Sequence, residues 1–155
     1  MTIPAYTSQR NEKIKIPSTV DLLVTWMKTR TVITDEVAQR ISSTLPKRDE
    51  DITYPWLTVS RVVGVVALPE AAIDRARIQF NAWGGVKANG APNWDPADKT
   101  IRAVEMELRT TLSAHVPSKG YIMSTGVLQG IQQLEDPDDG GAKFWMDFIV
   151  VARSE

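Results

Sequence analysis

Apolar and polar residues alternate most regularly in the stretch IDRARIQFNAW, residues 73–83. One side of an extended chain would carry Ala76, Ile78, Phe80 and Ala82, and the other would carry Arg75, Arg77, Gln79 and Asn81. A period of two residues predicts a β-strand with one buried face. Residues 56–68 are rich in β-branched side chains and also predict a strand. We expect the two strands to form an antiparallel hairpin.

Two other stretches have the period of a helix. Residues 18–30 predict one, with Ser18 as N-cap and apolar residues at Val20, Leu23, Val24 and Met27. A second helix is predicted to begin with Asp95 as N-cap and Pro96 at its first position. Its apolar stripe is Ala97, Ile101, Val104, Leu108 and Leu112. Between the first helix and the hairpin, the pattern predicts a short extended piece near residues 40–44, with a short helix over residues 35–43 as the alternative.

The chain closes with a second predicted hairpin, in which strands 126–135 and 142–152 flank the turn DPDDGG. The order helix, hairpin, helix, hairpin indicates the α+β class. We expect an antiparallel sheet of four to five strands with two helices packed on one face. The polar residues 1–16 predict a flexible N-terminal arm, and residues 17–155 predict a single domain.

The last strand carries large apolar side chains on both of its faces. Phe144, Met146, Phe148 and Val150 suit the core beneath the helices, which leaves Trp145, Ile149 and Val151 on the opposite face with Asp147. By the same parity Trp83 shares that face with Arg75 and Arg77. Tryptophan and arginine anchors in a polar setting are typical of protein interfaces. We therefore predict a subunit interface at Arg75, Arg77, Trp83, Trp145, Ile149 and Val151; the alternative is cover by the arm or a long loop of the same chain.

Composition narrows the classes of function. The 155 residues include no cysteine, which excludes disulfides, thiolate nucleophiles and cysteine-ligated zinc. A net charge of −1 argues against a protein that mainly grips nucleic acid. No window approaches 18 consecutive apolar residues and the start has no apolar signal region, so we expect a soluble protein without a membrane partner.

Signals for catalysis or ligand binding are weak. The single histidine, His115, is predicted to lie near the end of the second helix without a catalytic partner. The turn DPDDGG fails the EF-hand register, because its fifth position is Gly140 and its twelfth is Asp147. Phosphate-binding and nucleophile-elbow motifs are missing, and Phe80 falls on the face opposite Arg75, where it cannot stack a base. We predict no enzyme activity, no cofactor and no metal.

The order of these motifs resembles the tail-terminator, or tail-completion, proteins of long-tailed bacteriophages, a group that includes minor tail and head–tail joining proteins. The likeness runs from about Ser18 to Arg153. It comprises the first helix, RISSTLP, YPWLTVSRV, ARIQFNAWG, a helix that starts with Asp-Pro-Ala, VLQGIQQLEDPDDGG and the final strand FWMDFIVVAR. The arm 1–16 and the loop GGVKANGAPNW look longer than is usual in that family.

The resemblance implies a structural virion protein at the head-proximal end of the tail, assembled in the host cytoplasm. Its homohexameric ring would cap the tail tube, stop tube polymerisation and join a head connector protein, while DNA passes through without specific recognition. The loop after residue 84 would then line the channel or contact the tail tube protein, with Lys87, Asn89 and Trp94 as candidates. The alternatives are a head-closure, adaptor or tail-tube role, or a small ligand- or nucleic-acid-binding α+β domain.

Overall fold

The structure is a computed structural model that describes residues 18–47, 51–62, 73–111 and 113–155. The described residues form three helices and six strands. In chain order these are α2 (Thr19–Met27), α3 (Thr31–Val37), β1 (Ile41–Ser42), β2 (Trp56–Val62), β3 (Ile73–Gly85), α4 (Trp94–Thr110), β4 (Ala114–Val116), β5 (Gly120–Glu135) and β6 (Ala142–Arg153).

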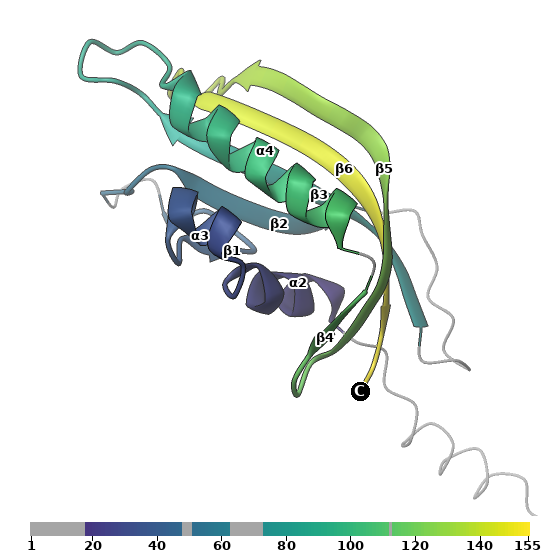
Figure 1. The fold of residues 1–155 in the computed structure, drawn as a ribbon. Helices are drawn as coiled ribbons and strands as arrows, with labels where there is room; N and C mark the ends of the chain where they lie inside the picture. Colours follow the sequence, from purple (N-terminus) through teal and green to yellow (C-terminus); the bar gives the residue numbers. More distant parts are fainter. Residues whose placement is uncertain (1–17, 48–50, 63–72, 112) are drawn as a thin grey trace, which may run out of the picture.

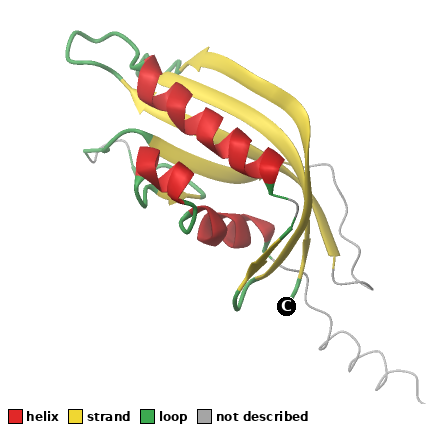
Figure 2. Cartoon of the chain, in the orientation of Figure 1, coloured by secondary structure: helices red, strands yellow, loops and turns green. Residues whose placement is uncertain are grey.

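The six strands form one sheet in the order β1-β2-β3-β6-β5-β4. β1 runs parallel to β2, and every other neighbouring pair is antiparallel. The helices lie on one side of this curved sheet (Figures 1 and 2). The α+β class and the two predicted hairpins, β2–β3 and β5–β6, are therefore confirmed. The predicted count of four to five antiparallel strands and two helices was too low, because it lacked α3 and the short strand β4 and took the whole sheet as antiparallel.

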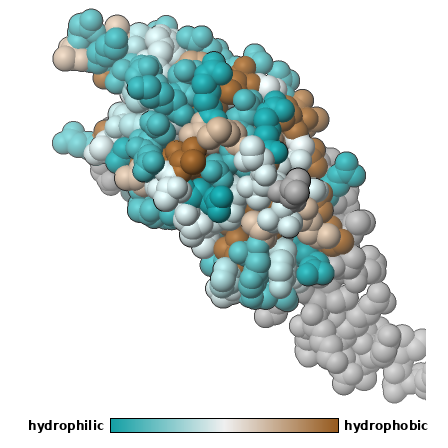
Figure 3. Space-filling view, in the orientation of Figure 1, coloured by the Kyte–Doolittle hydropathy of each residue, from teal (hydrophilic) through white to brown (hydrophobic). Residues whose placement is uncertain are grey.

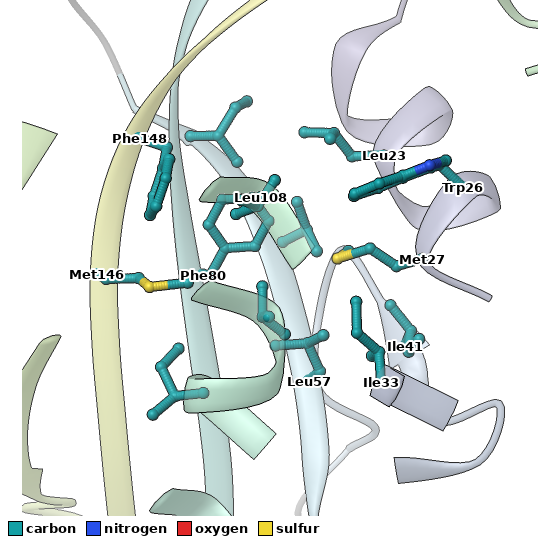
Figure 4. Close-up of a cluster of buried hydrophobic side chains, with 14 of the residues drawn as sticks. Leu23, Trp26, Met27, Ile33, Ile41, Leu57, Phe80, Leu108, Met146 and Phe148 are labelled. Carbon is teal, nitrogen blue, oxygen red and sulfur yellow. The ribbon is translucent and has the colours of Figure 1, made fainter. Parts of the chain in front are cut away.

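The core lies between the helices and the sheet. Its largest fully buried side chains include Leu23 and Met27 from α2, Leu57 from β2, Phe80 from β3 and Phe148 from β6 (Figure 4). The rings of Phe80 and Phe148 meet edge to face, with centroids 6.0 Å apart. The inward parity predicted for Ala76, Ile78, Phe80, Ala82, Phe144, Met146, Phe148 and Val150 is confirmed, because all of them are buried.

The first helix follows its sequence signals closely. The Ser18 side chain accepts a hydrogen bond from the backbone N–H of Asp21, as expected of an N-cap. The helix is shorter than predicted, since it ends at Met27 and a separate helix, α3, follows. In that next segment Ile33 and Val37 are buried on α3 and Ile41 on β1. The expected extended piece near residues 40–44 is therefore present as β1. The short helix that was the alternative over 35–43 is present too, but it lies earlier, as α3, and shares only residues 35–37 with that range.

Other predicted boundaries need correction. Helix α4 begins at Trp94, so Asp95 lies in its first turn rather than at the N-cap, and it ends at Thr110, before Leu112. His115 lies on β4 rather than at a helix end, and its ring stacks on that of Tyr121 with the two ring centroids 4.5 Å apart. Strand β5 begins at Gly120 rather than at residue 126. The arm 1–16 and the end of the predicted strand 56–68 lie outside the described residues.

Candidate subunit interface

The face of the sheet that points away from the helices is the candidate site, and we call it the open face. The strand register decides which residues belong to the open face, because residues that pair across neighbouring strands have their side chains on the same face of the sheet. Arg75 pairs with Val151, Arg77 with Ile149, Asn81 with Trp145 and Trp83 with Lys143. Trp145, Ile149 and Val151 are each partly buried, and none reaches the full burial of the opposite face. The six predicted interface residues therefore do share one face; their role in an interface stays a prediction.

A half-buried ion pair lies at the centre of the open face. Nε and Nη2 of Arg77 both donate to Oδ2 of Asp147, at 3.0 and 2.6 Å. The Asp147 side chain is 1% exposed, whereas that of Arg77 is 38% exposed. The carboxylate of Asp147 is therefore buried, whereas the guanidinium of Arg77 that binds it reaches the surface.

Two oxygen atoms on the open face, one of them in this ion pair, have no hydrogen-bond partner among the described residues. They are Oδ1 of Asp147 and Oδ1 of Asn81, both buried in the described structure. The Asn81 amide nitrogen reaches the side-chain oxygen of Gln79 only at 3.4 Å. A buried acceptor without a donor costs roughly 1–3 kcal/mol. These two acceptors therefore lower the stability of the described part of the chain.

Tryptophans line the end of the open face that is nearest the β3–α4 loop. Trp56 on β2 pairs with Trp83 on β3. The indole N–H of Trp83 donates to the Thr58 hydroxyl at 3.0 Å, and that of Trp56 donates to the Ser42 hydroxyl at 2.8 Å. The Lys143 ammonium lies 4.6 Å from the centre of the Trp83 ring. Burial lowers the pKa of Lys143, although the charge of Asp136 acts in the opposite direction.

A groove of about 460 Å³ occupies the other end of the open face. It is lined by Ile149 and Val151 of β6, by Gly126 of β5 and by Arg75 of β3. The Arg75 guanidinium makes no ion pair with any described residue and is exposed. This end of the face thus joins an apolar hollow to an available cation.

The three candidate loop residues are not brought together. Lys87 and Asn89 lie exposed in the loop between β3 and α4, which extends beyond the sheet at the upper left of Figure 1. Trp94 instead belongs to α4 and packs edge to face on Phe144, with ring centroids 5.6 Å apart. Trp94 was assigned to the loop because the Asn-Trp-Asp-Pro sequence suggested a later helix start. It is better described as a residue that packs against the core.

Several residues of the open face had not been identified from the sequence. Lys143 has the same parity as Trp145, so alternation alone could have placed it there. Trp56 and Thr58 follow only from the register of β2 against β3. The sequence pattern places Asn81 and Asp147 on the correct face. It does not indicate that they are buried, because their burial depends on neighbours from other strands.

Features outside the open face suggest little chemistry. His115 Nε2 lies 2.7 Å from a carboxylate oxygen of Glu155, within an exposed pair. The described residues include no group of three or more His, Asp or Glu side chains arranged to hold a metal ion. None of their helices is long and apolar enough to cross a bilayer. Seen from the helix side, the surface is mostly hydrophilic, with hydrophobic residues in several separate places (Figure 3).

The family named from the motif order is not supported independently by sequence comparison. Searches of protein-family models and of curated proteins find no match to this chain.

Proposed function

We propose that this protein is a non-enzymatic tail-terminator protein, whose copies form a ring on the end of a bacteriophage tail tube. In this role the ring ends tube polymerisation and offers its outer side to the head connector. The motif order from Ser18 to Arg153 suggests the family, and the open face supplies the physical support. The proposed ring size, a hexamer, comes from the resemblance alone.

One observation carries the self-association: the side chains of Trp145 and Ile149 stay partly exposed on the open face. A second protein surface can remove this apolar area from water and can meet the exposed guanidinium of Arg75 on the same face. The oxygens Asp147 Oδ1 and Asn81 Oδ1 are too buried for either water or a partner to reach, so they do not select a partner.

A ring needs two different surfaces on each copy, because a head-to-tail contact repeats around the symmetry axis. The open face supplies one of them. The edge strand β5 is a candidate for the other, since four of its side chains are large, apolar and substantially exposed. These are Met123, Val127, Leu128 and Leu134, at 40–49% exposure. β5 pairs with β4 only through residues 120–122, so the rest of that edge lacks a described neighbour.

The test is to add the purified protein to tail tubes that are growing from purified tail tube protein. A terminator is expected to shorten the tubes in proportion to its concentration and to appear as a ring at one tube end by electron microscopy. Unchanged tube length would contradict the proposal. Binding to DNA-filled heads that lack tails, with no effect on tubes, would favour the head-closure role instead.

A further inference from the structure

One stretch of the edge strand β5 combines a free edge with a hollow beside it. β4 pairs only with residues 120–122, so the described part of the chain offers no strand neighbour to the outer edge of β5 beyond them. Residues 124–127 pair regularly with β6, between two register shifts. The groove of the open face is lined on its β5 side by Ser124, Thr125 and Gly126, which belong to the same stretch. The free edge and the groove therefore adjoin.

This stretch lacks the features that usually protect an exposed edge. β5 contains no lysine, arginine or proline, and residues 124–127 include no register shift. Gly126 and Val127 are exposed, and a methyl group on Gly126 would meet no atom within 4 Å. A regular edge next to a hollow suits the addition of an extended segment from another chain. The two backbones then share hydrogen bonds, and the hollow receives a side chain.

The chain itself contains a segment that suits such an edge. In EKIKI, residues 12–16, apolar and charged residues alternate. The segment lies outside the described residues. A period of two places Glu12, Ile14 and Ile16 on one side of an extended segment and the two lysines on the other.

The side of the segment that carries Glu12 matches the open face in charge. Arg75 lines the groove, is exposed and makes no ion pair with any described residue. It lies in the same row of the sheet as Ser124, because both pair with Val151. Glu12 is the only carboxylate side chain of the arm 1–16. With Glu12 turned toward the open face, the arm brings an anion to Arg75, while its two lysines point to the opposite side of the sheet.

We infer that residues 12–16 of one copy add as a strand, parallel to β5, along residues 124–127 of a second copy. Ile14 then lies over Gly126 and fills the groove, and Glu12 pairs with Arg75. The inference rests on the proposed function, because it names the contact that joins neighbouring copies. The arm is one surface of this contact, and the edge of β5 with the adjoining groove is the other. Such a contact is head to tail and can close a ring.

The arm of the same copy is too short for this contact. In the parallel arrangement the end of the segment lies beside Val127 or beyond it, whereas Thr19 donates a hydrogen bond to Asp74. Asp74 and Val127 lie two strands apart and four residues apart along the sheet, because their partners on β6 are Ala152 and Phe148. With one more strand spacing for the added segment, the separation is about 19 Å. The three residues from the end of the segment to Thr19 span at most about 11 Å.

Charge reversals test the ion pair. Glu12→Arg and Arg75→Glu each place like charges together, so each variant alone should need about tenfold more protein to assemble than the natural chain. An equimolar mixture of the two variants should regain the natural concentration dependence, because the reversed arm of one then meets the reversed groove of the other. The double variant should regain it too. Sedimentation velocity over a concentration series measures all four samples.

A second pair of variants tests the filling of the groove. Ile14→Asp replaces the apolar side chain that enters it, and assembly should need at least about tenfold more protein. Ile3→Asp is the matched control, because Ile3 lies in the same arm but outside the segment. The control should assemble like the natural chain. Equal assembly of the two variants would contradict the groove contact.

The outcomes separate this inference from the proposed function. Single reversals that assemble normally, or a natural chain that is monomeric at every concentration, would overturn the contact. Recovery in the double variant without recovery in the mixture would place the contact within one copy and overturn it as well. The tube-length experiment judges the cap role by itself. Arm variants that shorten tubes as well as the natural chain would leave the cap role and remove the contact, whereas the reversal pattern without any effect on tubes would do the opposite.

Discussion

Arg77 on β3 and Asp147 on β6 form an ion pair in which one carboxylate oxygen receives both hydrogen bonds. The second oxygen is buried and receives none in the described structure. The pair lies 70 residues apart in sequence and joins the two central strands of the sheet. The pair therefore links β3 to β6, while the second oxygen of Asp147 stays buried without a hydrogen bond.

Removing only the arginine should be harmful. Arg77→Met leaves the Asp147 carboxylate buried without its counter-ion, and the free energy of unfolding should fall by about 2–3 kcal/mol. The estimate is below the cost for a fully buried pair because Arg77 is 38% exposed. Adding Asp147→Leu to that variant should recover at least half of the loss, since a well-packed apolar side chain needs no counter-ion. Urea denaturation of both variants measures this; two simply additive losses would contradict it.

Trp145 should matter more to assembly than to folding. Trp145→Glu puts a charge next to the two unpaired acceptors of the open face, and association should weaken about 30-fold, as for an interface hot spot. Met106→Glu is the control, because Met106 is 50% exposed on the helix α4. Mass measured in solution should fall toward the monomer for the first variant only. Equal masses for the natural chain and Trp145→Glu at all concentrations would disprove the role of this face.

Two glycines with positive φ allow a paired test of backbone strain and packing. Gly85, at φ +67°, faces the Tyr54 ring so closely that a methyl group would lie 2.5 Å from Cδ2. Gly90, at φ +83°, has open space. Gly90→Ala should cost about 1–2 kcal/mol from the left-handed conformation alone. Gly85→Ala should cost about 1–3 kcal/mol more because the ring must move. Thermal unfolding compares them; equal costs would show that Tyr54 adjusts freely.

Sequence periodicity predicted the parts of this fold that depend on local pattern. The alternation of Ala76, Ile78 and Phe80 correctly gave the buried face of β3, and Ser18 correctly gave the start of α2. Both signals are read within a few residues, where side-chain spacing and capping chemistry decide the outcome.

The short strands depend on distant partners. β1, which was predicted as an extended piece near residues 40–44, has two residues and pairs with the edge of β2. β4 likewise pairs with the start of β5, so His115 ended on a strand rather than on a helix. For the candidate site, parity placed Trp145 and Ile149 on the correct face. It could not reveal the groove or the unpaired oxygen of Asp147, since these arise where three strands meet.

Acid should weaken the attachment of α2 to the sheet through Asp74. This buried carboxylate accepts hydrogen bonds from Thr19 on α2 and from Arg61 on β2. Burial by itself would raise the pKa of Asp74, but the hydrogen bonds from Arg61 and Thr19 and the charge of Arg61 outweigh it and leave the pKa below its ordinary value. A carboxylate with a lowered pKa in the folded state stabilises that state above the pKa of the unfolded chain, about pH 4. This stabilisation is lost as the pH falls through the lower, folded value.

The Asp74→Asn variant isolates that contribution. At pH 7 it should unfold with a free energy about 2–3 kcal/mol below that of the natural chain, because hydrogen bonds to a buried charge are lost. The difference should shrink as the pH falls below about 4 and through the lower folded pKa of Asp74, since the natural carboxylate is then protonated too. Asp95→Asn is the control: Asp95 is 76% exposed in its pair with Lys99, so its effect should stay within about 0.5 kcal/mol at any pH. Denaturant titrations across this range provide the measurement. A loss for Asp74→Asn that stays constant from pH 7 down to the lowest pH at which the chain is folded would mean that the ionised form of Asp74 does not hold α2 against β3.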